Sequence, residues 1–380
     1  MGVLQGINRR AKLISALIIL GGAGLFFSPG VAAYETEITL RLLVWDGYVS
    51  LTTQERFSAA IKSKYNIDLS FKITDASNPD DFFDTLRMGD VDIISPAHNL
   101  AKDSRYNLTT NGLTLPIDLS AIPNYQKLLP HLHKQSWAME KGKTYAVPVA
   151  HGIYGLAYNT DLVKTEPTSW EILWDPRYRG RYTVHHDYYE LNTYISALAL
   201  GHGQDQIFHY DRIKGPALEQ KIDLLAANAG VFWKGFDRPE HYRNMALATT
   251  WRISFPQIDD SFKKWRIAVP KEGTTWWIDT LMISHTLEHR PLALKIAHGF
   301  INTLLEPEVQ LLSISKGLGT CPVTVSALDS YMKTLLPPEE APKVARLFKG
   351  FIPWKTLATR DRNAFKLLWD EALAKTGKGK

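Results

Sequence analysis

The sequence predicts an α/β fold of two lobes, in which mixed sheets are flanked by helices and a hinge joins the lobes. The first observation is a strand–helix–strand–helix–strand order between residues 40 and 95. The second is a further α/β stretch that begins near Val147. The third is that residues suited to ligand binding gather in two clusters, one on each stretch. Two such blocks are typical of proteins that close around a ligand.

The first α/β stretch alternates apolar strands with amphipathic helices. Its order predicts a mostly parallel sheet covered by helices, because a crossover between parallel strands needs a helix-length connection. Ligands of open sheets lie at the carboxyl ends of the strands, which here are residues 45–48 and 95–98. The expected elements are strands at 40–44, 67–73 and 91–95 and helices at 57–65 and 80–88.

The second stretch predicts the rest of the fold. We expect strands at 153–159, 181–184, 246–251 and 265–269, and helices that begin at Ser169 and span 191–200, 288–305, 306–316 and 360–375. Lobe one should contain residues 34–148 and 279–325, and lobe two residues 149–278 and 326–380. The chain should cross between the lobes near 147–152 and 277–281.

The first 33 residues have the composition of a cleaved secretory signal. Arg9, Arg10 and Lys12 form a basic head without acids, and an apolar run at 13–27 leads to small residues at 28–33. The run of roughly 15 residues is shorter than the ~20 that a membrane-spanning helix needs. Cleavage after Ala33 would leave 347 residues, and because no cysteine follows the run, we expect a soluble exported protein without a lipid anchor.

Charge and cysteine content exclude several classes of function. Loss of the three cations in the signal lowers the formal charge from +5 to +2, and no basic block is present of the kind that nucleic acid requires. Cys321 is the single cysteine of the sequence, so neither an internal disulfide nor a zinc site of cysteines is expected. No nucleophile elbow, HExxH or phosphate loop occurs, so we expect a monomeric binding protein without catalytic residues, metal or cofactor.

Three acids stand out because tryptophans flank them. Asp187 and Glu190 follow a predicted strand three residues apart and would converge if residues 188–190 begin a helical turn. Asp279 follows Trp277, and Trp45 and Trp251 each end a strand. An alkylammonium group that enters a cleft loses hydration, a cost recovered only by charge pairing and hydrogen bonds. Indole rings add cation–π attraction of about 0.5–2 kcal/mol. Taken alone, the acids could equally be helix caps or solvated charges and the rings plain core.

Five stretches carry a resemblance to a known family over nearly the whole chain after the signal. They are WDGYV at 45–49, DIISP at 92–96, Trp170 with LWDPRYRG at 173–180, Trp251, and WWIDTL at 276–281. In these stretches the chain resembles the periplasmic spermidine/putrescine-binding proteins of ABC transporters. The resemblance implies the type II periplasmic binding protein fold, a polyamine ligand, a location in the periplasm, and delivery to an inner-membrane ABC permease.

The resemblance also implies roles for particular residues. Trp45 and Tyr48 would stack on the ligand chain, and Asp46 would replace an acid or polar residue that the family often carries just before the tyrosine. The carboxylates would take the ammonium groups, and two further tryptophans would flank the chain. The implied ligand-binding residues are Trp45, Asp46, Tyr48, Asp187, Glu190, Trp251, Trp277 and Asp279.

Departures from the family pattern leave the identity of the polyamine open among spermidine, putrescine and norspermidine. Ala97, His98 and Asn99 stand where the family tends to have Ser and an aromatic residue, and no tyrosine occurs near 319–321. Lys355 would repel one end of a cationic ligand if it faced the cleft.

Two alternatives remain open from the sequence. The protein could act as a periplasmic polyamine sensor that presents its ligand state to a membrane cyclic-di-GMP receptor. It could also bind ferric ion or another metal through Tyr188 and Tyr189 or through the histidine pairs 131/133 and 185/186.

Overall fold

The computed structural model describes residues 36–255 and 262–377, so the predicted signal at 1–33 lies outside the described residues. The described residues from Thr36 onward form one compact unit. Two sheets organise it, one of eight strands and one of five, with a small two-stranded hairpin beside them. None of the helices among the described residues combines the length and the apolar composition that a membrane span requires.

The larger sheet begins with the parallel strands that the sequence predicts. β1 (Glu37–Val44) pairs in parallel with β2 (Asp68–Asp75) and with β3 (Ile93–Ile94). The long strand β13 (Thr274–Ser284) then runs antiparallel to β3, β4 (Thr114–Leu115) and β7 (Val147–Ile153). The path is β14-β7-β13-β3-β1-β2, with β4 and β15 also paired to β13; β14 is Cys321–Pro322 and β15 is Phe351–Pro353.

The second sheet has the order β10-β9-β11-β8-β12. Its first three strands are parallel, and β8 runs antiparallel to both β11 and β12. The strands are β8 (Gly155–Asn159), β9 (Tyr182–His185), β10 (Val231–Trp233), β11 (Leu247–Thr250) and β12 (Trp265–Ile267). The hairpin consists of β5 (Met139–Glu140) and β6 (Lys143–Thr144).

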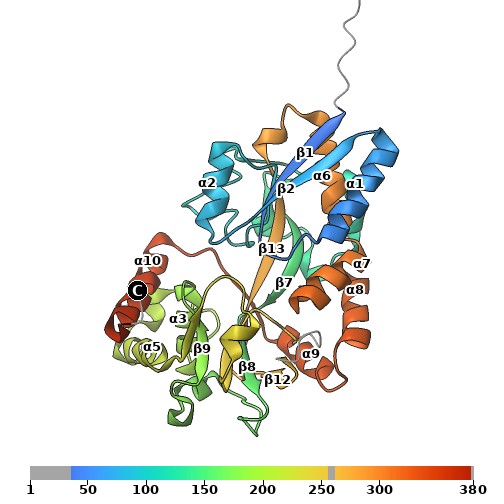
Figure 1. Ribbon diagram of the computed structural model, residues 1–380. Coiled ribbons are helices and arrows are strands. Elements are labelled where there is room, and N and C mark those ends of the chain that lie inside the picture. Colours follow the sequence, from blue (N-terminus) through green and yellow to red (C-terminus); the bar gives the residue numbers. More distant parts are fainter. Residues whose placement is uncertain (1–35, 256–261, 378–380) are drawn as a thin grey trace, which may run out of the picture. The chain divides into compact units, whose positions relative to one another are not determined.

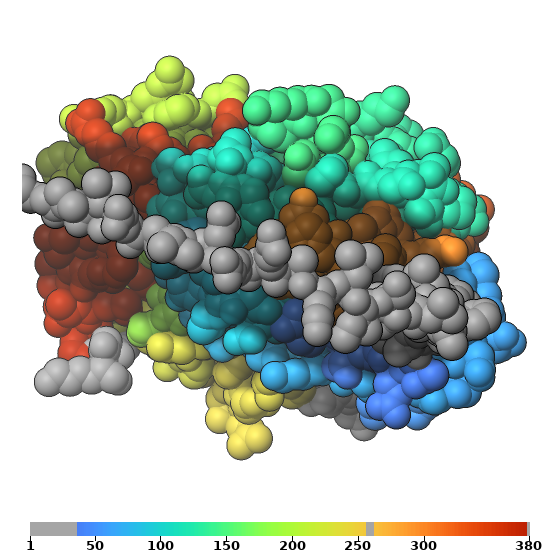
Figure 2. Space-filling model, turned by 90° about the horizontal axis from the view of Figure 1, so that it is seen from above, coloured from blue at the N-terminus to red at the C-terminus, as the bar shows by residue number. Residues whose placement is uncertain are grey.

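Helices cover both sheets (Figure 1). Helices α1 and α6 pack against the strands β1 and β2, and α10 packs against α3 and α5 beside the second sheet. From above, the C-terminal segment in red and the blue segments that begin the described chain lie on opposite sides of the visible face (Figure 2). The helices are α1 (Leu51–Tyr65), α2 (Asp80–Met88), α3 (Tyr189–Ala199), α4 (Tyr210–Ile213), α5 (Pro216–Asn228), α6 (Pro291–Leu304), α7 (Pro307–Val309), α8 (Val325–Ser330), α9 (Ala341–Lys349) and α10 (Thr359–Thr376).

The chain passes between the sheets at Tyr154. The strand predicted at 153–159 is β8, which begins at Gly155 in the second sheet, whereas Ile153 is the last residue of β7 in the larger sheet. Tyr154 is fully buried, and its hydroxyl donates to Asn192 Oδ1 at 2.8 Å. The apolar run conceals this change of sheet because both strands are buried on both faces. The division of these strands between lobes stays a prediction.

Two of the predicted helices have other geometries. The segment that Ser169 caps is a 3₁₀ helix over Trp170–Trp174. The helix predicted at 306–316 begins at Pro307 and continues as a π-helical segment over Gln310–Gly317. Buried Gln310 donates to the carbonyl oxygens of Val149 and Leu304 there, at 2.9 and 2.8 Å. Such widened turns occur frequently at functional sites.

Candidate functional site

A cavity of about 470 Å³ opens where strand ends of the two sheets face each other. Its volume is in the range of pockets that hold small organic ligands. Seven of the eight residues predicted to bind the ligand line this cavity, namely Trp45, Asp46, Tyr48, Asp187, Trp251, Trp277 and Asp279. Glu190 lines a neighbouring pocket instead.

Trp45 and Tyr48 are positioned by the tight turn that follows β1. Gly47 takes φ +84°, a backbone conformation that favours glycine, and a Cβ built there would lie 2.6 Å from Leu318 Cδ2, so that leucine side chain would have to shift. Trp45 packs edge-to-face on Phe82 with ring centroids 5.2 Å apart. The turn therefore directs two aromatic side chains into the cavity from the larger sheet.

Asp279 and Trp277 reach the cavity from the middle of β13. They lie two residues apart and hence on one face of the strand, and the register with β7 shifts between Asp279 and Thr280. Gly152 of β7 pairs with Trp277, and a Cβ at that glycine would lie 2.5 Å from Trp277 Cζ2. The indole N–H of Trp277 donates to the carbonyl oxygen of Ile153 at 3.2 Å. The absence of a side chain at Gly152 thus makes room for the ring.

Asp279 is a buried carboxylate at the aromatic wall. It is 7% exposed, and the Tyr48 hydroxyl donates a hydrogen bond to it. Burial raises the pKa of Asp279 to about 7, although Tyr48 and the nearby indole of Trp45 act to lower it. The Trp45 N–H forms no regular hydrogen bond with any of the residues that the structure describes. A cation beside Asp279 would favour its ionised form.

Tyr188, Trp251 and Trp354 form an aromatic cluster, in which Tyr188 and Trp251 follow strands β9 and β11 of the second sheet and Trp354 follows β15 of the larger sheet. Trp251 directly follows β11 and donates through its indole N–H to the carbonyl oxygen of Gly235 at 2.9 Å. Its ring centroid lies 5.0 Å from that of Tyr188 and 6.1 Å from that of Trp354. All three rings line the cavity, so they can cover the methylene groups of an extended ligand.

Asp187 lies at the rim, with its side chain 52% exposed. It accepts a hydrogen bond from His186 Nδ1 at 2.5 Å and lies 3.5 Å from Lys234 Nζ. Burial acts to raise the pKa of Asp187, but the His186 hydrogen bond and the Lys234 charge outweigh it, and the pKa is lowered. Asp46 forms a second rim pair with Arg238 at 3.4 Å.

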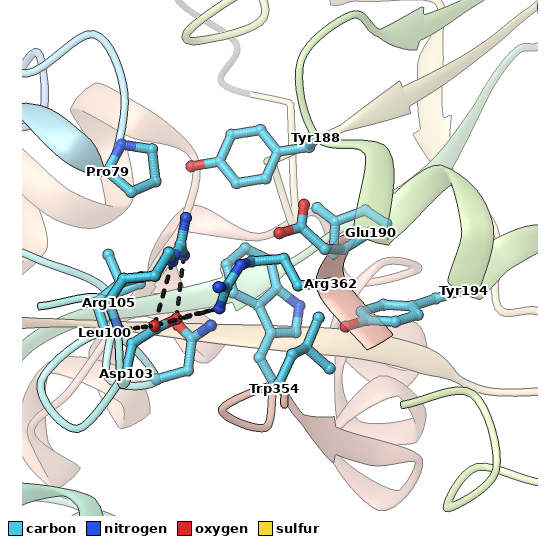
Figure 3. A pocket seen from close by; sticks show the side chains of 13 residues that line it. Pro79, Leu100, Asp103, Arg105, Tyr188, Glu190, Tyr194, Trp354 and Arg362 are labelled. Atoms are coloured by element: carbon cyan, nitrogen blue, oxygen red, sulfur yellow. Dashed lines mark hydrogen bonds and ion pairs between the residues drawn. The ribbon is translucent and has the colours of Figure 1, made fainter. Parts of the chain in front are cut away.

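Asp187 and Glu190 line two adjoining pockets, and their action on one ligand stays a prediction. Helix α3 begins at Tyr189, so Asp187 precedes the helix and Glu190 lies in its first turn. Glu190 lines a pocket of about 50 Å³ together with Asp103, Arg105 and Arg362 (Figure 3). Burial raises the pKa of Glu190 to about 7, partly offset by the Tyr189 hydroxyl and both guanidinium groups.

The residues that depart from the family pattern have definite places. Lys355 pairs with Asp205 at 2.8 Å. It is not among the described residues that line either cavity, so its charge does not repel a cationic ligand there. His98 is buried and bonded, with Nε2 2.8 Å from the Trp354 carbonyl oxygen and Nδ1 3.3 Å from the Ile278 amide nitrogen. Burial lowers its pKa to about 4. Asn99 lines the small pocket.

Phe236 and Trp354 line the cavity although the sequence did not predict them there. Tyr188 lines it as an aromatic residue, although the sequence marked it only as a possible metal ligand. Asp75 also lines the cavity, and the sequence could have predicted it. It ends β2, and ligands of open sheets bind at the carboxyl ends of parallel strands. Among the described residues, no group of three or more histidine, cysteine, aspartate or glutamate side chains is placed to hold a metal ion.

Two mixed sheets joined by crossing strands, with an acidic and aromatic cavity between their strand ends, define a two-lobed α/β ligand-binding protein. Residues 90–334 match the family model described as bacterial extracellular solute-binding protein. Because the match covers more than half of the chain, the protein belongs to this family.

Named relatives agree with this assignment. The chain is 26% identical over 221 residues to spermidine/putrescine-binding periplasmic protein 1 of Haemophilus influenzae, a match that spans 57% of each chain. It is 24% identical over 297 residues to the spermidine/putrescine-binding periplasmic protein of Salmonella typhimurium, covering 77% of this chain and 79% of that one. The resemblance noted in the sequence is confirmed.

The fold is shared with solved structures. The putative spermidine/putrescine ABC transporter from Listeria monocytogenes superposes with a TM-score of 0.70 at 18% identity, covering 88% of this chain and 98% of that one. At this identity the likeness establishes the fold, and the two-lobed type II architecture predicted from the sequence is confirmed. The ligand must be argued from the site.

Proposed function

We propose that this protein binds a polyamine in the periplasm and delivers it to an ABC permease of the inner membrane. The observation that carries the proposal is the buried carboxylate of Asp279, which lies among indole rings in a cavity of about 470 Å³. The periplasmic polyamine-binding relatives support the same class of ligand.

The chemistry of the site suits a slender organic cation. Polyamine nitrogens have pKa values near that of lysine, about 10.4, and stay charged at neutral pH. An ammonium group beside Asp279 would ionise the carboxylate and pair with it, which offsets the loss of hydration of both groups. Trp45, Trp251 and Trp277 would cover the methylene chain and attract the charge through their ring faces.

The rim supplies further negative charge. Asp46, Asp75 and Asp187 line the cavity together with two cations, Lys234 and Arg238. Counted with Asp279, four carboxylates face two basic groups, so the cavity favours a cationic ligand over an anionic one. We propose that Asp187 takes a second ammonium group near the cavity mouth, beside Asp46 in its ion pair with Arg238.

Location and partner complete the proposal. Residues 1–33 would direct export, and the ligand-loaded protein would present both lobes to the permease. Deletion of the genes for the partner permease should abolish polyamine uptake that depends on the protein. If uptake persists and a membrane cyclic-di-GMP receptor responds to the protein instead, the sensor function replaces transport.

The binding proposal is tested on protein purified from the periplasm. Mass spectrometry of small molecules released by denaturation should detect a polyamine. Calorimetry with putrescine, spermidine and norspermidine should give saturable binding, and a ligand at 100 times its dissociation constant should stabilise the fold by about 2.7 kcal/mol. Absence of both binding and stabilisation with all three amines would overturn the proposal.

A further inference from the structure

Arg252 is a buried cation that lies outside both the large cavity and the small pocket. It follows Trp251 directly after β11, is 7% exposed, and is not among the described residues that line either space. Removing a guanidinium group from water is costly unless its charge is paired and its N–H groups find acceptors. The contacts of Arg252 therefore show which parts of the fold this charge holds in place.

On one side, Arg252 holds the loop that follows β10. Its Nη2 donates to the carbonyl oxygen of Asp237 at 3.1 Å, and its Nε lies 3.5 Å from the carboxylate of the same residue. Asp237 is fully buried and also accepts hydrogen bonds from the Thr250 hydroxyl at 2.6 Å and the Trp251 amide at 3.3 Å. The guanidinium group lies 4.7 Å from the ring centroid of Phe236. Because Phe236 lines the cavity, Arg252 fixes part of the wall that the second sheet contributes.

On the other side, Arg252 holds the segment that leads into β14 of the larger sheet. Its Nη1 donates to the carbonyl oxygen of Leu318 at 2.9 Å. Beside this bond, the amide of Ile253 donates to the carbonyl oxygen of Gly319 at 2.9 Å. Leu318 is buried and directly follows the π-helical segment. One guanidinium group thus connects a loop of the second sheet with a segment of the larger sheet.

Leu318 supports the turn that carries Trp45 and Tyr48. Its Cδ2 lies 2.6 Å from the position that a Cβ of Gly47 would take, so the leucine side chain packs directly against this glycine. From the same turn, the Tyr48 hydroxyl donates to the carboxylate of Asp279. A continuous series of contacts therefore joins the two walls of the cavity through the guanidinium group.

Stability alone does not account for an ion pair buried at this place. Replacing a buried ion pair with apolar residues of similar volume is often neutral or stabilising. A buried charge does, however, favour one arrangement of the groups around it, because other arrangements leave it without partners. The pair of Arg252 and Asp237 is suited to fixing how the two walls face each other.

We propose that Arg252 is a positioning residue for ligand binding, which sets the turn of Trp45 and Tyr48 relative to the wall that the second sheet contributes. Arg252 acts through Leu318 and does not touch the ligand. The inference rests on the proposed polyamine-binding function and deepens it, because it makes affinity depend on a residue outside the cavity.

Calorimetry on the full-length exported protein with putrescine, spermidine and norspermidine tests the inference. Arg252→Lys keeps the positive charge but loses the planar fork of donors that reaches acceptors on both sides. Leu318→Ala keeps the carbonyl acceptor and removes the side chain that packs against Gly47. Each substitution should weaken the binding of the tightest of the three amines about fivefold or more, a factor common within one contact network.

The double variant separates positioning from a purely structural role. In the Leu318→Ala background, Arg252→Lys should weaken binding about twofold at most, because both substitutions act through the same side chain. Arg266→Lys is the matched control: this arginine of β12 pairs with Glu340 at 3.4 Å and is not among the described residues that line the cavity or the small pocket. It should keep the affinity of the parent, and urea unfolding measures the stability of every variant.

The outcomes distinguish this inference from the proposed function. If Arg252→Lys or Leu318→Ala binds like the parent, or if their losses of affinity multiply in the double variant, the inference is overturned while polyamine binding stands. If the parent binds none of the three amines, the proposed function fails and the inference with it. Should Arg252→Lys fail to fold, Leu318→Ala decides, because it leaves the guanidinium group and its acceptors in place: weaker binding by the folded variant supports the inference, and parent affinity overturns it.

Discussion

The charge of Asp279 couples the stability of the unliganded protein to pH. Its folded pKa of about 7 exceeds the ordinary value near 4, so the folded protein binds the proton more tightly than the unfolded chain does. Stability should therefore fall as pH rises from about 4 to about 7, by at most about 4 kcal/mol, and stay reduced above 7. Asp279→Asn should be more stable than the parent at pH 8, as measured by urea unfolding.

The control for this prediction is Asp187→Asn. The pKa of Asp187 is lowered in the folded state, so its ionised form favours folding above the unfolded pKa, and the substitution should give no gain in stability at pH 8. The pKa of Glu190 is raised in the folded protein, like that of Asp279. Part of the pH dependence of stability should therefore remain in the Asp279→Asn variant. Equal stability of the parent and Asp279→Asn at pH 8 would contradict the raised pKa.

Polyamine affinity should depend on pH through the same carboxylate. A cation binds the ionised form, so affinity should rise between pH 5 and about 7, at most about tenfold for each pH unit, and level off above. Binding at pH 6 should release a proton, which calorimetry in buffers of different ionisation enthalpy detects. Asp279→Asn should bind more weakly at pH 8 and lose most of this pH dependence; an unchanged profile would place the ammonium group elsewhere.

The sequence could predict the large cavity better than the small pocket. Trp45, Trp251 and Asp279 could be predicted because strand ends and family motifs mark them in the sequence. The pocket around Glu190 depends on Asp103 and Arg362, which are 259 residues apart and meet only in the folded chain. No local sequence pattern predicts such a contact, and in the sequence Arg362 is indistinguishable from an ordinary exposed charge on an amphipathic helix.

At the scale of elements, the pairing of β7 with β13 positions Trp277. Gly152→Ala should displace the ring, because the new Cβ would lie 2.5 Å from Cζ2, and overpacking of this kind costs about 1–3 kcal/mol of stability. Polyamine affinity should fall as well, since Trp277 lines the cavity. Thermal unfolding and calorimetry measure the two effects.

Gly203→Ala is the matched control for this substitution. A Cβ there would meet Gln206 at 3.5 Å, an ordinary contact, and Gly203 does not have the positive φ that alanine resists. The control should keep wild-type stability and affinity. If Gly152→Ala behaves like the control, the ring of Trp277 is not held against β7 in solution.

The elements differ in how far hydrophobic periodicity determines them. Helix α2 follows the predicted range, because its apolar residues recur with the period of a helix over its whole length. The break between β7 and β8 at Tyr154 could not be predicted, since both strands are continuous apolar runs and only long-range pairing separates them. The π-helical segment at Gln310–Gly317 depends on tertiary hydrogen bonds of Gln310 to another strand, which periodicity does not encode.

At the scale of the whole molecule, ligand binding requires groups from both sheets to act together. Trp45, Tyr48 and Asp279 come from the larger sheet, and Trp251 and Asp187 from the second sheet and the segment that follows its strand β9. A ligand that contacts both sets stabilises the arrangement in which they face each other. Contacts between the two sets that do not involve the ligand should then control its rate of escape.

The ion pair of Asp46 and Arg238 is such a contact. Asp46 follows β1 of the larger sheet, Arg238 follows β10 of the second, and both side chains line the cavity with exposed fractions of 58% and 61%. An exposed pair contributes about 0.2–1 kcal/mol, so its loss should accelerate ligand dissociation about 1.4- to 5-fold, less at high salt. Arg238→Gln and Asp46→Asn should share this effect on dissociation.

Association should separate the two variants. Arg238→Gln removes a positive charge that repels the incoming cation and should bind faster than the parent at low salt, whereas Asp46→Asn removes an attractive charge and should bind more slowly. Stopped-flow tryptophan fluorescence measures both rates, because four tryptophans line the cavity. If the two variants change the association rate in opposite directions but both increase the dissociation rate, the ion pair is a contact that retains the ligand. Dissociation at the parent rate in both variants would leave the pair with only a steering role, because a contact that does not slow escape does not hold the cavity shut.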